Sequence, residues 1–194
     1  GQGKNRLSSI ASLRFFDTFA QAAFDSSFNL PSPPAQPVVD VATDHGKVVL
    51  SWDAASRNNY NQPGYKFEGY NIYQGASVAG PWTLLATYDE LTPPAVVFDA
   101  VFDIESGQII PLFPVALGSN LGVRFTHTIT QDAVRGGNLN DGTQYYFAVT
   151  SYSYNGAGKP KVLENPQTPL SIIPQRAAAG TAYATASATP VTHL

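Results

Sequence analysis

The sequence of 194 residues has three histidines and no cysteine, so its side chains suited to acid–base or metal chemistry are few. His45 lies in a short turn, His127 lies in an alternating segment, and His193 lies near the end. None has a second histidine at metal-ligand spacing, and no HExxH, GxSxG, phosphate-loop or dinucleotide motif occurs. The lack of cysteine excludes disulfides, thiolate metal sites and a cysteine nucleophile. We therefore expect His127 to be structural.

Acidic residues gather in and around the segment 89–121. They are Asp89, Asp99, Asp103, Glu105 and Asp132. Calcium takes about six to eight oxygen ligands, usually from closely spaced Asp and Asn residues, and no Asp-x-Asp-x-Asp run is present. Glycoside hydrolysis needs two carboxylates that face a cleft. The sequence indicates no such cleft. We expect no enzyme activity, no catalytic residue, no cofactor and no metal; whether these acids bind calcium stays open.

The composition is typical of a turn-rich β protein with little surface charge. Charged residues make up 13% and aromatic residues 12%, whereas about 25% charged residues is usual. A net charge of −3 argues against a nucleic-acid partner. No run approaches the roughly 18 apolar residues of a membrane span, and no signal segment is visible. Because the chain begins with Gly1, we interpret it as a processed product or a piece of a longer polypeptide.

Alternation of apolar and polar residues predicts the strands that would position these side chains. The predicted strands span residues 37–43, 47–53, 68–74, 80–88, 122–130, 145–152 and 168–174. Side chains that alternate toward one face of these strands, together with a leucine in the turn before 145–152, predict a common core. The core candidates are Trp52, Tyr70, Ile72, Leu139, Tyr145 and Phe147.

The stretch 139–149 carries the most specific pattern. Leu139 stands three residues before Gly142 and six before Tyr145, which opens an alternating strand. This spacing resembles the tyrosine corner of fibronectin type III domains, and the segments 50–52 and 69–73 also resemble that family. The resemblance implies an all-β, fibronectin type III-like (immunoglobulin-like) antiparallel β-sandwich over residues 37–175.

Four further segments do not belong to such a sandwich. Within an insertion at about 89–121, two apolar runs flank a Ser106-Gly107 turn and predict a hairpin between the strands that the family calls C′ and E. Within the N-terminal extension 1–28, apolar residues at three- and four-residue spacing predict an amphipathic helix, followed by a proline-rich linker, 29–36. The Ala/Thr-rich tail 176–194 is expected to be extended, and it either starts a following domain or adds as a strand to an open sheet edge, in its own chain or another.

The helix must bury its phenylalanines against its own domain, against an upstream domain or against a neighbouring copy. A membrane surface is disfavoured because its polar face carries only Arg6, Arg14 and Asp17. The candidate interaction residues are Phe16, Phe19, Phe24, Trp82 and Tyr183.

Two functions follow from this pattern. The first is a non-enzymatic structural or interaction module of a secreted or cell-surface protein, as members of the resembled family mostly are. It would act through protein–protein contacts with copies of itself or with other domains of the same polypeptide, and could form a surface multimer or filament. The alternative is an accessory polysaccharide-binding or spacer domain of a larger secreted hydrolase, because the aromatic residues in excess of the core could stack on carbohydrate.

Overall fold

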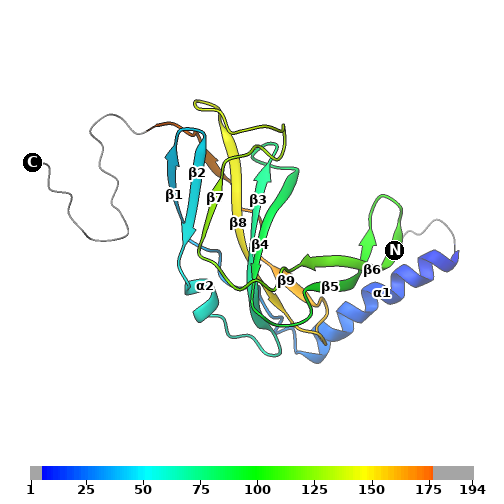
Figure 1. Cartoon of the computed structure of the whole chain (residues 1–194). Coiled ribbons are helices and arrows are strands. Elements are labelled where there is room, and N and C mark those ends of the chain that lie inside the picture. Colours follow the sequence, from blue (N-terminus) through cyan, green and yellow to red (C-terminus); the bar gives the residue numbers. More distant parts are fainter. Residues whose placement is uncertain (1–5, 177–194) are drawn as a thin grey trace, which may run out of the picture.

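The computed structural model describes residues 6–176, and most of its regular structure is antiparallel β-strand (Figure 1). The described helices are α1 (Arg6–Asp25), as the apolar periodicity predicted, and the short α2 (Ala55–Asn58). The strands are β1 (Val39–Asp44), β2 (Lys47–Trp52), β3 (Lys66–Gly75), β4 (Trp82–Asp89), β5 (Val96–Asp103), β6 (Gln108–Leu117), β7 (Thr126–Ile129), β8 (Tyr145–Tyr154), β9 (Val162–Glu164) and β10 (Leu170–Ile172).

Two antiparallel sheets share one apolar core, an arrangement compatible with a β-sandwich (Figure 1). One sheet has the order β1-β2-β7. The other has the order β10-β8-β3-β4, with β9 also paired to β8. The core forms because alternate residues of each strand point between the sheets, as Val48, Leu50 and Trp52 of β2 do. All six core candidates lie in this cluster.

Tyr145 fixes the turn that precedes β8. Its ring is buried beside Phe147, with ring centroids 6.2 Å apart, and the backbone N–H of Asn140 donates to its hydroxyl oxygen at 2.9 Å. Gly142 takes a φ of +75°, which a residue with a side chain rarely adopts. Leu139 is buried below it. The spacing of the leucine, glycine and tyrosine therefore places one side chain in the core, one bend in the turn and one hydrogen bond across it.

The predicted strand 122–130 is shorter than expected, because its pairing begins only at Thr126. The preceding residues still pack inward: Val123 and Phe125 contact the core, and the Phe125 carbonyl accepts the N–H of Trp52 at 3.0 Å. Two further elements, α2 and β9, carried no sequence prediction. Both are too short for a periodic pattern of their own.

Residues 34–36 of the proline-rich linker lie along the edge of β8. The amide of Gln36 donates to the carbonyl of Val149 at 2.8 Å, and the hydroxyl of Ser151 donates to the carbonyl of Ala35 at 2.9 Å. The Asn165 side chain donates to the carbonyl of Pro34 at 3.0 Å and accepts the N–H of Ser151 at 3.1 Å. Since β10 and β9 pair with the two ends of β8, these contacts fill the gap between them.

The insertion forms a two-stranded hairpin, β5–β6, and α1 packs against β6. We call α1 and this hairpin together the arm. The base of the hairpin is fixed to the sandwich by Val97 and Ala116, which pack on Tyr152, and by the N–H of Lys161, which donates to Asp99 at 2.9 Å. These contacts lie at the Tyr154 end of β8. The described chain leaves from the other end, where Ile172 of β10 pairs with Tyr145 (Figure 1).

Candidate interaction surface

Helix α1 contacts the hairpin through one side only. Ser12 is the buried residue of the helix and, beside Ser8 and Ala11, it faces Gln108 and Ile109 of β6. The ring of Phe16 also meets Phe102 of β5 edge to face, with centroids 5.1 Å apart. The predicted apolar stripe lies largely outside this contact. Its exposed members are Leu7, Ile10, Leu13, Phe16 and Phe24, whereas Phe19 is half-buried and packs on Phe15 with centroids 5.1 Å apart.

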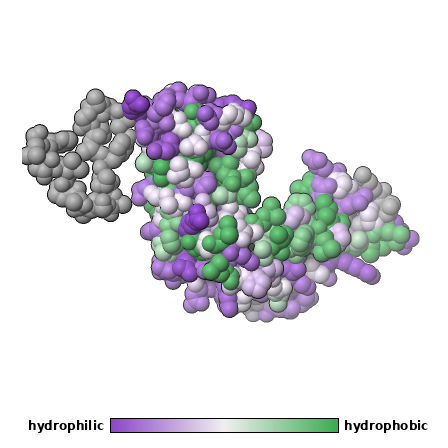
Figure 2. Space-filling model, viewed as in Figure 1, coloured by the Kyte–Doolittle hydropathy of each residue, from purple (hydrophilic) through white to green (hydrophobic). Residues whose placement is uncertain are grey.

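The hairpin adds further apolar side chains to the same arm. Leu112 of β6 is 74% exposed, and Ile104 at the hairpin turn is 86% exposed. Other exposed members are Val96, Phe98, Ile110, Phe113 and Leu117. Figure 2 shows many hydrophobic residues on the arm, with hydrophilic residues among them. Scattered apolar residues are normal on a protein surface, but a gathering of exposed large apolar side chains marks an interaction site.

Charge is unevenly distributed over the arm. Strand β6 contains no charged residue, and α1 carries two arginines and two aspartates. Strand β5 and the hairpin turn add three acids, Asp99, Asp103 and Glu105. Removing a large apolar side chain from water is worth roughly 1.5–3 kcal/mol. Several such side chains therefore supply enough free energy for association, and strand β6 adds no charge that would oppose it.

Trp82, the fourth interaction candidate, lies away from the arm at the start of β4. It is half-buried, and its indole packs so closely over Gly75 and Gly80 that a Cβ at either glycine would approach a Trp82 atom to 2.9 Å. The glycines thus make room for the ring. Tyr183, the fifth candidate, lies outside the described residues.

The aromatic residues that sequence reasoning set apart from the core mostly serve the fold. Tyr60 donates to the carbonyl of Ser32 at 2.9 Å, and Tyr65 donates to the carbonyl of Pro160 at 2.5 Å. Tyr152 is fully buried under the hairpin base. The hydroxyl groups of Tyr60 and Tyr65 and the ring of Tyr152 are therefore engaged within the fold rather than free to bind a sugar.

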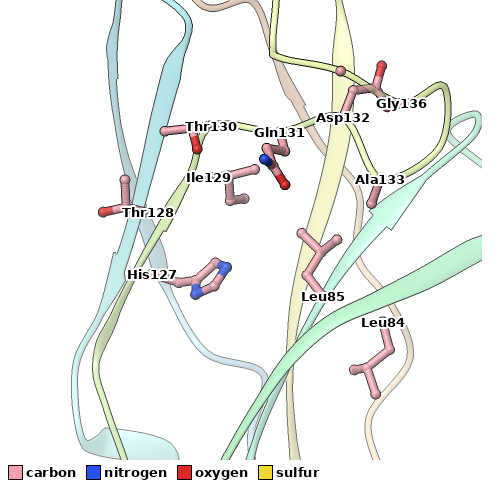
Figure 3. Close-up of a pocket in the computed structure, with 11 residues that line it drawn as sticks. Leu84, Leu85, His127, Thr128, Ile129, Thr130, Gln131, Asp132, Ala133 and Gly136 are labelled. Atoms are coloured by element: carbon pink, nitrogen blue, oxygen red, sulfur yellow. The ribbon is translucent and has the colours of Figure 1, made fainter.

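His127 lies in a groove of about 590 Å³ between β7 and β4, the facing edges of the two sheets. Its imidazole lies between β7 and the leucines 84 and 85 of β4 (Figure 3). The Nδ1 atom is 2.7 Å from the hydroxyl of Tyr88, and burial lowers the pKa of His127. The hydrogen bond between His127 of β7 and Tyr88 of β4 joins the two sheets, which is a structural role.

The acids of the insertion hold turns rather than a cluster. Asp89 is buried, and its Oδ1 accepts the N–H groups of Ser119 at 2.9 Å and Asn120 at 2.8 Å. Asp132 accepts the N–H groups of Val134 at 3.0 Å and Arg135 at 2.9 Å. Within residues 6–176, no group of three or more acidic or histidine side chains is arranged to hold a metal ion.

Sequence reasoning missed a buried polar cluster on the outer face of β3 and β8. The Oε1 atom of Glu164 on β9 accepts hydrogen bonds from Asn71 at 3.1 Å, from the hydroxyl of Tyr73 at 2.8 Å and from Thr150. Burial, and then the nearby Glu164, raise the pKa of Tyr73. The outward polar positions of β3 and β8 were visible in the alternation. Their partner was not, because β9 follows a long turn.

The chain matches no protein-family model and no curated protein. In the part of the chain that the structure describes, neither helix has the length and apolar content needed to cross a bilayer.

Proposed function

We propose that this chain is a structural interaction module without enzymatic activity, and that its arm binds further copies of the same chain. The observation that carries the proposal is the large number of exposed apolar side chains on α1 and β5–β6. A soluble monomer rarely exposes such a patch, so another surface must cover it. A second copy fits because it brings exposed apolar side chains of the same kind, and because the two arginines of α1 can pair with the acidic side chains on the hairpin of another copy.

The wider assignment is a fibronectin type III-like module of a secreted or cell-surface protein. Its support is the order β1-β2-β7 facing β10-β8-β3-β4, together with the Leu139, Gly142 and Tyr145 turn. In this assignment the sandwich is the rigid body, and the hairpin inserted between β4 and β7 carries the contact surface. A binding surface on an insertion is a common way in which one sandwich fold acquires different partners.

Sedimentation velocity over a range of protein concentrations tests the proposal. The wild-type chain should form larger species as concentration rises. A variant with Leu13→Ser and Leu112→Ser should need at least tenfold higher concentration to do so, because both exposed side chains lie on the arm. Val78→Ser, which changes an exposed valine in the β3–β4 turn, is the matched control and should assemble like the wild type. A wild-type chain that stays monomeric throughout would overturn the proposal.

A further inference from the structure

Strand β1 is the outermost strand of its sheet among the described residues. Strand β1 pairs with β2 and, within residues 6–176, with no strand on its other side. Val41 lies opposite Leu50 in the ladder and therefore shares the core face with it. Leu50 is fully buried, yet Val41 is 41% exposed. The sandwich thus leaves a core-facing side chain uncovered between β1 and the three-residue strand β10 of the opposite sheet.

The backbone of β1 also presents hydrogen-bonding groups at this edge. Across an antiparallel ladder, residue pairs alternate between hydrogen-bonded and non-hydrogen-bonded. The N–H of Trp52 donates to Phe125 on the β7 side, so the pair Val39–Trp52 is non-hydrogen-bonded. Two residues further along, the pair Val41–Leu50 has the same character, and the N–H of Val41 points away from β2. Exposed strand edges of this kind are templates for an added strand.

The described chain ends close to the C-terminal end of β1, at Asp44. The N–H of Gly142 donates to the carbonyl of Pro174 at 2.9 Å, and Asp141 contacts His45 in the β1–β2 turn, with Oδ2 2.5 Å from Nδ1. The backbone N–H of His45 and, less strongly, the charges of Lys47 and Arg176 lower the pKa of Asp44, the last residue of β1. The last described residues therefore lie close to the β1–β2 turn.

The segment that follows has the length and pattern of a strand that fits β1. Residues 181–186 read Thr-Ala-Tyr-Ala-Thr-Ala, which alternates and matches the six residues of β1. No charged residue occurs between 177 and 192. The four residues 177–180 end in Gly180 and span about 13 Å when extended, enough to cross the roughly 10 Å between packed sheets. A strand that starts after residues 177–180, beside the Asp44 end of β1, would run antiparallel to β1.

We propose that residues 181–186 add to the outer edge of β1 in their own chain and cover Val41. A segment tethered a few residues from the edge has a millimolar effective concentration there, which favours the chain's own segment over a second copy's. The added strand would leave the arm as the surface through which copies associate. This inference does not depend on the function proposed for the arm.

Amide hydrogen exchange of Val41, resolved by NMR on the full chain, tests this inference. The variant with Ala184→Pro and Thr185→Pro removes one N–H from each edge of the segment, so at least one hydrogen bond to β1 is lost whichever edge pairs. We expect Val41 to exchange at least tenfold faster in this variant than in the wild type. Ala188→Pro, beyond the matched residues, is the control and should leave the rate unchanged.

The amide of Ala42 serves as an internal reference because its N–H faces β2. Its exchange rate should be equal in the three proteins, which separates loss of the added strand from loss of the fold. Equal exchange of Val41 in the wild type and the double-proline variant would overturn the inference. Protection of Val41 that grows with protein concentration would overturn it as well, because the covering strand would then come from another copy.

Discussion

Single residues decide whether the turn before β8 holds its shape, and Tyr145 is the clearest case. Replacing it by phenylalanine keeps the buried ring but removes the acceptor of the Asn140 N–H. We expect Tyr145→Phe to lower the free energy of unfolding by about 1–2 kcal/mol, because a hydrogen bond is lost and a donor is left without its partner. Urea denaturation measures this. Tyr146→Phe, at the half-buried neighbouring position, is the control and should change the free energy of unfolding by under about 0.5 kcal/mol. Equal effects of the two changes would contradict a stabilising role for the hydrogen bond between Asn140 and Tyr145.

A second residue-scale prediction concerns pH and His127. Burial lowers the pKa of this imidazole in the folded state, whereas an unfolded histidine has a pKa of about 6.5. The unfolded state therefore binds the proton first as pH falls. The stability that His127 contributes is present above pH ~6.5 and is lost as pH falls through the folded-state pKa. Unfolding free energies measured from about pH 7.5 to 5 should decline more steeply for the wild type than for His127→Gln. Parallel curves would show that His127 titrates alike in both states.

At the scale of elements, the attachment of α1 rests on few contacts, chiefly Ser12 against β6 and Phe16 against Phe102. A lone helix of this length is marginal in water. Phe102→Ala should therefore raise amide exchange in α1 at least tenfold and leave the exchange of β8 unchanged. Val78→Ala removes an exposed side chain outside the arm and is the control. Faster exchange in β8 with Phe102→Ala would mean that the arm and the sandwich unfold as one unit.

The sequence predicted those elements whose side chains repeat with a clear period. Alternation located Trp52, Tyr70 and Phe147 in one core, and three- and four-residue spacing located α1. It could not locate β9, because three residues carry no period and the hydrogen bond from Asn71 to Glu164 joins residues far apart in the sequence. It also predicted that the stripe of α1 would be buried without showing which surface buries it. Within the described residues, Leu13 and Phe24 of this stripe remain exposed.

For the whole molecule, the arm and the last described residues lie at opposite ends of the sandwich (Figure 1). The apolar surface is thus separated from the β1 edge, and the two can act independently. Association through one surface on every copy gives a closed dimer when the patch contacts itself, and a ring or filament when it contacts a different surface. The low charge of the chain, 13% of residues, weakens the repulsion that would keep copies apart.

Thiol labelling tests the central claim most directly, because the chain has no cysteine of its own. Leu112→Cys places one thiol on the arm, and Val78→Cys places one in the β3–β4 turn. If the arm is the surface between copies, a water-soluble maleimide should label position 112 at least tenfold more slowly at high protein concentration than at low concentration. Position 78 should react at one rate throughout. A rate at position 112 that is independent of concentration would contradict the account.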